Sequence, residues 1–173
     1  MDVRRKVALG GWMFTRRREP WAEGAAPARS WGLYALAETR LSGVPGGVRG
    51  LSCFARLGTA SDAVDRLGLS VGGGLLYRGP WARRPNDALG LGAFHARNGS
   101  PFLRASREEG DALGRSETVV ELLYRLEAGD ALVLEPDLQW ILNPGTDPSL
   151  DHALVFGLRL HFLLDYSGGG PGG

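Results

Sequence analysis

The protein has 173 residues with 20 basic and 19 acidic side chains, and its formal net charge is +1. A chain of this length fits one domain, and its near-neutral balance leaves no global field that would hold nucleic acid or an anionic membrane surface. Glycine accounts for 27 residues and hydrophobic residues for 43% of the chain. Because glycine weakens helices and this apolar content is too high for disorder, the composition favours an all-β fold.

Apolar and polar residues alternate along most of the chain, and this period of two predicts β-strands with one apolar and one polar face. About eight segments of about ten to twelve residues show the pattern, which is the length of a tilted membrane-spanning strand and exceeds that of a typical globular strand. In chain order the predicted strands are Arg4 to Phe14 (the weakest), Trp31 to Ser42, Arg49 to Thr59, Leu67 to Tyr77, Asp87 to Arg97, Glu117 to Glu127, Leu132 to Leu142 and Ala153 to Phe162.

The connections between these segments alternate in length. Longer connections, such as 15–30 and 98–116, are separated by tighter turns, such as 42–48 and 128–130. Bacterial outer-membrane barrels have long loops on one side and short turns on the other, so this spacing favours that class. Aromatic residues near the strand ends of the apolar face would form the interfacial girdles of such a barrel. They are Trp31, Tyr77, Tyr124, Trp140 and Phe162.

A soluble β-sandwich or lipocalin-like barrel is the alternative to a membrane barrel. It also alternates, but it turns its apolar face inward and covers its outer face with mixed charge. In this sequence the polar face carries glycine, serine and alanine beside isolated Glu and Arg residues, a composition that suits a wet lumen. The two classes differ in whether the leucines and valines of the strands lie inside or outside.

Six stretches of the sequence are similar to one known family. They are Gly32 to Leu41, Gly50 to Gly58, Leu69 to Pro80, Asp87 to Ala96, Glu117 to Arg125 and Leu134 to Gly145. Over about Val7 to Phe162 the chain resembles the C-terminal half of the carbohydrate-selective porin family, the OprB type of Gram-negative outer membranes. The stretch Gln139 to Gly145 is the most specific part. The resemblance implies an outer-membrane β-barrel that passes small sugars down their gradient and is not an enzyme, without catalytic residues, bound metal or cofactor.

The chain departs from that family in its length. Family barrels have about sixteen strands, and this chain supplies about eight, without a visible signal peptide. We expect an antiparallel transmembrane β-barrel segment at residues 1–162 and a glycine-rich C-terminal tail at 163–173. If the eight strands close into a barrel, side chains fill its interior. If they stay open, the backbone N–H and C=O groups of the two edge strands have no hydrogen-bond partner in lipid.

Two functions therefore stay open. A partner chain or a missing N-terminal half would complete a sugar-conducting porin. Alternatively, the chain is a non-transporting protein, either a small eight-stranded structural outer-membrane barrel or an inactive porin fragment.

The polar face supplies the candidate substrate-binding residues. In a porin, arginines opposite carboxylates would form a wall that hydrogen-bonds sugar hydroxyls, and aromatic rings would stack on sugar rings. Alternatively, these groups pair with one another and stabilise the interior. The lumen-lining candidates are Tyr34, Glu38, Arg40, Phe54, Arg56, Glu121, Arg125, Glu135, Asp137 and Arg159.

Other motifs carry weaker signals. Gly72-Gly73-Gly74 lies within a predicted strand, so it suits strand packing and not phosphate binding. The three histidines lack metal-ligand spacing, and the single cysteine, Cys53, excludes an internal disulfide. The run Arg16 to Arg18 falls in a predicted long loop, where it would meet lipopolysaccharide phosphates of the outer leaflet.

Overall fold

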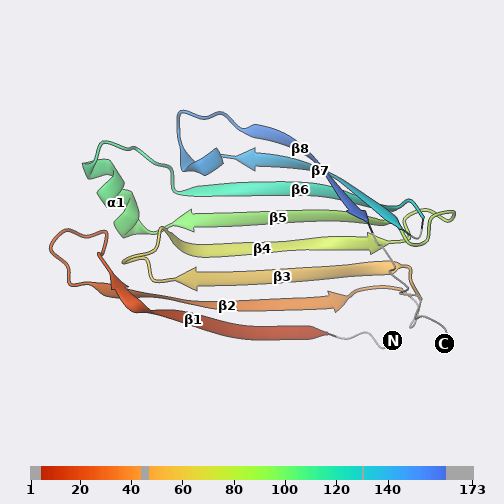
Figure 1. Ribbon diagram of the computed structural model, residues 1–173, viewed down its shortest axis with the longest axis horizontal. Coiled ribbons are helices and arrows are strands. Elements are labelled where there is room, and N and C mark those ends of the chain that lie inside the picture. The colour runs from red at the N-terminus through yellow and green to blue at the C-terminus, as the bar shows by residue number, and fades with distance from the viewer. Residues whose placement is uncertain (1–4, 44–46, 130, 163–173) are drawn as a thin grey trace, which may run out of the picture.

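The strands form one continuous sheet in which each strand pairs with its neighbour in the chain (Figure 1). The computed structural model describes residues 5–43, 47–129 and 131–162, and within them the sheet has eight antiparallel strands in the order β1 to β8. Their bounds are β1 (Lys6–Arg18), β2 (Ala28–Arg40), β3 (Gly50–Ala60), β4 (Leu67–Arg78), β5 (Ala88–Asn98), β6 (Ser116–Glu127), β7 (Leu132–Leu142) and β8 (Ala153–Phe162). The predicted eight strands are confirmed, and the tail predicted at 163–173 lies outside the described residues.

The first strand is longer than predicted. It continues beyond Phe14 to Arg18, so the run Arg16 to Arg18 belongs to β1 and its prediction as a loop is wrong. The pairing with β2 shifts between Met13 and Arg17, after which Arg17 pairs with Arg29. Such a bulge breaks the alternation of side chains, and the sequence pattern therefore loses the strand at that point.

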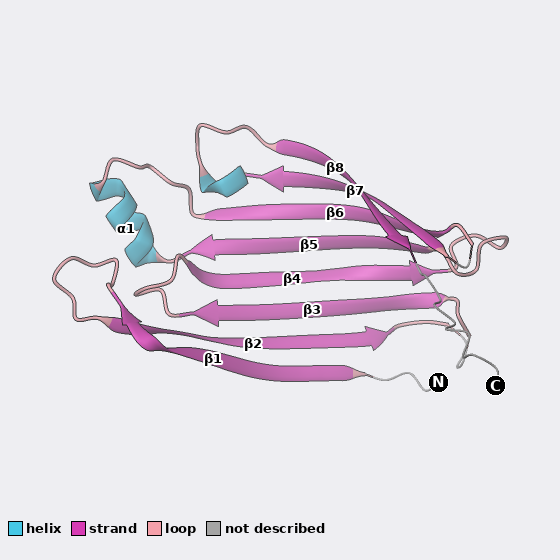
Figure 2. Ribbon diagram, in the orientation of Figure 1, coloured by secondary structure: helices cyan, strands magenta, loops and turns pink. Residues whose placement is uncertain are grey.

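The connection predicted as a loop at 98–116 contains the helix α1 (Ser100–Glu108). A proline in its first turn favours helix initiation, and Leu103 and Ser106, one turn apart, are its buried residues. A short 3₁₀ helix, η1 (Pro144–Thr146), lies in the β7–β8 connection. Figure 2 shows both helices at the end of the sheet that also carries the β1–β2 loop, opposite the tight turns. No helix of the described residues has the length and apolar character needed to cross a membrane.

Hydrogen bonds from Arg66 tie the long connections to the sheet. Its guanidinium donates to the side-chain oxygens of Asn98 (3.2 Å) and Thr146 (3.0 Å) and to the carbonyl of Gly145 (2.6 Å). Asn98 in turn donates to the carbonyl of Gly114 at 2.9 Å. Because Asn98 and Thr146 are both 3% exposed, these bonds satisfy polar groups that water does not reach. The long-loop end is therefore an ordered part of the fold.

One face of the sheet is apolar and open. Pairing places Leu75, Leu91, Leu122, Leu138 and Phe156 in one row across β4 to β8, and each of these side chains is at least 40% exposed. Among the described residues, the buried hydrophobic side chains are just Val64, Ala88, Leu103 and Val133. A soluble β protein of this size would bury its leucines in a core, so the sheet has the apolar surface of a membrane barrel instead.

Neighbouring residues of β6 test this assignment, because Leu122 lies on the apolar face and Leu123 on the polar face. We expect Leu122→Arg to destabilise the protein in phospholipid vesicles by about 2–4 kcal/mol, because it places a charge in hydrocarbon. Leu123→Arg keeps its charge on the polar face and should cost less. Denaturant unfolding in vesicles measures both variants, and equal losses would contradict the assignment of the faces.

Candidate functional site

The candidate site is the polar face of the sheet. The pairing pattern places all the predicted lumen-lining residues on this one face, which is opposite the exposed leucines. Tyr34, Glu38 and Arg40 lie on β2, Phe54 and Arg56 on β3, Glu121 and Arg125 on β6, Glu135 and Asp137 on β7, and Arg159 on β8. The structure divides them into two groups, one on β2 and β3 and one on β6 to β8. Between the two groups the same face is lined mainly by glycine and apolar residues of β4 and β5.

Charged residues on β6 to β8 form a connected network. The guanidinium of Arg159 donates to Glu121 on β6 and to Asp137 on β7, each at 3.1 Å. Arg125 forms an ion pair with Glu135, which is also 3.0 Å from the Nε2 atom of His161. Every candidate on these three strands therefore has a partner of opposite charge. Such pairing keeps the wall polar while it limits the local net charge.

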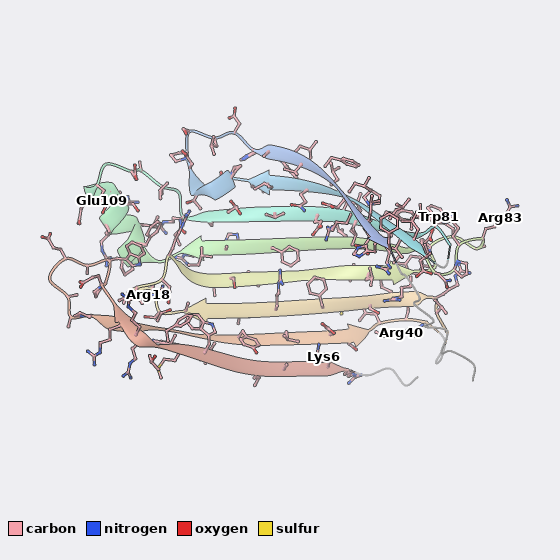
Figure 3. All side chains as sticks on the ribbon, viewed as in Figure 1. Lys6, Arg18, Arg40, Trp81, Arg83 and Glu109 are labelled. Carbon is pink, nitrogen blue, oxygen red and sulfur yellow. The ribbon has the colours of Figure 1, made fainter. Side chains whose placement is uncertain are left out.

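The charged candidates on β2 are also engaged. Glu38 lies 3.7 Å from the Nζ atom of Lys6 on β1, with both side chains more than half exposed. Arg40 donates to the backbone carbonyls of Ser42 and Gly47, each at 3.0 Å. Lys6 and Arg40 both lie toward the tight-turn end of the sheet (Figure 3). Arg40 therefore contacts described residues on both sides of the β2–β3 connection, Ser42 and Gly47, which spacing within one strand does not reveal.

Four aromatic rings of the polar face, on β1, β2, β3 and β5, each lie over a glycine of the neighbouring strand. The directly paired residues are Trp12 with Gly32, Tyr34 with Gly10, Phe54 with Gly74, and Phe94 with Gly72. A Cβ atom added at any of these four glycines would overlap the facing ring. Glycine therefore provides the space in which the rings lie flat against the backbone of the wall.

The central contact of this group joins Arg56 and Phe94. Both residues pair with Gly72, one from each side, and the Arg56 guanidinium lies over the Phe94 ring at 4.3 Å from its centroid. Phe54 stacks beside the same ring with a centroid separation of 6.0 Å. No carboxylate of the described residues forms an ion pair with Arg56. Its planar donors therefore lie on an aromatic surface and are open to a ligand.

A hollow of about 440 Å³ lies next to this contact. Its lining on the polar face includes Tyr34, Arg56, Ser70, Phe94 and Glu117. The hollow thus combines aromatic surface with a cationic donor, a hydroxyl and a carboxylate, the groups that recognise a polyhydroxylated ring. Its volume is of the order expected for a small-molecule site.

Three of these lining residues, Ser70, Phe94 and Glu117, are not among the predicted lumen-lining residues. Alternation alone places all three on the charged face, so the signal is present in the sequence. Glu117 accepts a hydrogen bond from the backbone N–H of Gly145 in η1 at 2.5 Å, which joins the hollow to the β7–β8 connection. Ser70, on β4, lies opposite Gly58. The described residues contain no group of three or more His, Cys, Asp or Glu suited to a metal ion.

The fit of Phe94 over Gly72 is open to a direct test. Gly72→Ala should displace the Phe94 ring and destabilise the protein by about 1–3 kcal/mol, as overpacking does elsewhere. Gly90→Ala on the same face is the control, because its added Cβ would meet its nearest neighbour at an ordinary 3.5 Å. Denaturant unfolding measures both, and a Gly72→Ala variant as stable as Gly90→Ala would contradict the packing role.

Asp87 organises the opposite, tight-turn end of the sheet. It is 1% exposed and accepts hydrogen bonds from Tyr124 (2.5 Å), Arg84 (2.6 Å) and the backbone of Glu127 (3.1 Å). Burial by itself would raise the pKa of Asp87, but the hydrogen bonds from these three residues and the charge of Arg84 outweigh it and hold the pKa below its usual value. The ionised carboxylate therefore ties the β4–β5 turn to the end of β6.

This bonding predicts a pH-dependent stability. Asp87→Asn should destabilise the protein near neutral pH by about 1.5–3 kcal/mol, the range for hydrogen bonds to a charged group. Since the folded pKa is lowered, the advantage of the wild type is full above the ordinary carboxyl value of 3.8 and disappears as the pH falls through the folded pKa. Unfolding measured from pH 7 to pH 3 checks this, with the exposed Asp151→Asn as the control. A difference between wild type and Asp87→Asn that does not change with pH would contradict it.

The sheet and its two faces by themselves define the class of protein. Long membrane-length strands, an exposed apolar face, a polar face with a charge network, and long loops at one end together describe the wall of a transmembrane β-barrel. Solved structures agree with this class. The high-pH structure of Pseudomonas putida OprB matches 92% of this chain and 44% of its own chain with a TM-score of 0.83 and 23% identity. The low-pH structure matches 90% and 46% with a TM-score of 0.57.

A family model described as "Carbohydrate-selective porin, OprB family" matches residues 3–164. The chain therefore belongs to the OprB family of carbohydrate-selective porins, which are outer-membrane channels and not enzymes. Among curated relatives, Porin B of Pseudomonas aeruginosa is 29% identical over an alignment of 129 residues that covers 67% of this chain and 28% of that porin. Porin AaxA of Chlamydia abortus is 29% identical over 112 residues, or 65% and 24% of the two chains. The chain thus spans about a quarter of the length of these porins.

Proposed function

We propose that residues 1–162 of this chain form one wall of an outer-membrane pore through which small sugars diffuse passively. The observation that carries the proposal is the separation of the two faces. Exposed leucines occupy one face, whereas the other carries aromatic rings, the free donors of Arg56 and the ion pairs of Arg125 and Arg159. A wall between hydrocarbon and an aqueous lumen requires this division. Membership of a carbohydrate-selective family supports sugars as the solute.

The chemistry of the polar face suits a neutral polyol. Sugar hydroxyls both donate and accept hydrogen bonds, so a wall of guanidinium and carboxylate groups offers partners of both kinds. Paired charges, such as Arg159 with Glu121 and Asp137, limit the attraction that the wall would have for simple ions. The aromatic rings of Tyr34 and Phe54 offer apolar surface to the faces of sugar rings. The lumen-lining candidates would then act together to guide the sugar.

Conduction requires more strands than the described sheet contains. The pairing runs from β1 to β8, and no bond joins β8 to β1 among the described residues. In lipid, these two edges need partners for their backbone N–H and C=O groups. The further strands would come from a partner chain or from an N-terminal part of a longer protein. In that barrel, acyl chains would cover the apolar face, and Arg16 to Arg18 would approach the phosphates of lipopolysaccharide.

Cysteine labelling tests which face is wet. In a Cys53→Ala background, we expect Val119→Cys to react at least about tenfold faster than Val120→Cys with a water-soluble thiol reagent, because hydrocarbon excludes the reagent from the apolar face. Val119 lines the hollow on the polar face, and Val120 lies on the apolar face. A saturating hexose should slow the reaction at position 119 and leave position 120 unchanged. Faster labelling at position 120 would overturn the proposed orientation.

Liposome swelling tests conduction separately. The purified chain alone is expected to give no steady hexose flux, since the outer edges of β1 and β8 have no partner strand among the described residues. The same segment within a closed barrel is expected to give flux that falls when Arg56 is replaced by alanine. Flux through the isolated chain would show that no further strands are needed, whereas a closed barrel without flux would favour the non-transporting alternative.

A further inference from the structure

A second hollow lies outside the polar face, at the long-loop end of the sheet. It has a volume of about 260 Å³ and lies between the end of β5, the helix α1 and the start of β6. Four arginines line it, and no acidic residue of the described ranges does. They are Arg97, Arg104, Arg107 and Arg115. Arg104 and Arg107 lie three residues apart on α1, so they project from the same side of that helix.

None of these four side chains forms an ion pair within the described part of the protein. All four residues are exposed, and none takes part in an ion pair or a side-chain hydrogen bond between described residues. Arginine stays protonated at any physiological pH, so four positive charges converge on one hollow. This repulsion disfavours the folded state unless an anion relieves it. Arg18 and Arg66 at the same end of the sheet differ, because Arg18 lies 3.5 Å from Asp65 and Arg66 is bonded to Asn98.

The hollow lies at the margin of the apolar face. Arg97 pairs with Leu69 and Ser116 and follows Leu89, Leu91 and Ala93 along the apolar face of β5. In outer-membrane barrels the end with long loops faces the cell exterior. The hollow would therefore lie at the level of the outer headgroups, at the rim of the wall, with Arg97 on its lipid side.

We propose that this hollow binds a phosphate group of lipopolysaccharide, the phosphorylated glycolipid of the outer leaflet. The inference rests on the proposed placement of the sheet in the outer membrane. Planar guanidinium groups bind phosphate oxygens in pairs, and several of them around one site provide bidentate contacts from more than one direction. Ser100, the first residue of α1, also lines the hollow, where the positive end of the helix dipole adds to the attraction. The site anchors the barrel wall laterally and leaves the sugar path free.

Binding of lipid A to the full chain in detergent micelles tests the site. We expect the wild type to bind bisphosphorylated lipid A at least about tenfold more tightly than the same lipid with its phosphates removed, as loss of charge-assisted bonds implies. The double variant Arg104→Gln/Arg107→Gln should lose that preference. Because both side chains are exposed and have no bonds within the described protein, the variant is expected to fold, which the shift of the folded band on unheated gels verifies.

The matched control removes the same charge from the other end of the sheet. Arg78→Gln/Arg83→Gln has an equal change in net charge, and Arg83 extends from the β4–β5 turn far from α1 (Figure 3). It should bind lipid A within about twofold of the wild type, since screening limits distant charges. Equal losses in both double variants, no preference for the phosphorylated lipid, or binding of inorganic pyrophosphate at least as tight as that of lipid A would each overturn the proposal. Hexose flux and cysteine labelling are independent of these outcomes, so failure of this site and failure of the pore proposal are distinguishable.

Discussion

The structure depends on the alternation of apolar and polar residues along each strand and on a pairing register that keeps this alternation aligned between neighbouring strands. A shift of one residue in any pair would turn leucines to the wet side and arginines to the lipid side, so pairing and burial specify each other. Glu38 pairs with Phe54, and Phe54 with Gly74, and this row continues through Gly92 to Glu121 without changing face. The bulge in β1 interrupts the pattern just where the strand leaves the apolar band. The two faces, the hollow and the charge network all follow from this continuity.

Large residues on the polar face are accommodated by small ones opposite. The rings of Tyr34 and Phe94 occupy space that an alanine across the strand would fill, and Asp137 lies against Gly157 in the same manner. The high glycine content, which at first indicates only weak helices, thus has a definite role in this sheet. It lets bulky and charged side chains lie close to the wall, where they occupy less of the cross-section of a lumen.

The sequence indicates the strands and their faces because both follow from local alternation. It also places Phe94 and Glu117 on the charged face, although neither was recognised as a candidate. Contacts between strands could not be predicted in this way. The partners of Arg159 depend on the register of β6, β7 and β8, and the sequence of one segment does not determine that register. Alternation likewise fails at α1, where the residues Ser100 to Glu108 follow a helical period, and at the β1 bulge. The hollow with four arginines brings together residues from three elements and is visible only in three dimensions.

Because every strand that the structure describes pairs only with its neighbours in the chain, the hairpin is the natural unit of growth of this architecture. Adding or removing a hairpin changes the circumference of a barrel while each remaining hairpin keeps its own inner and outer chemistry. Width and selectivity are thus separable properties, one set by the number of hairpins and the other by the side chains that each contributes. A lineage of such proteins can enlarge or narrow its conduit by gene duplication or deletion without rebuilding the groups that recognise the solute.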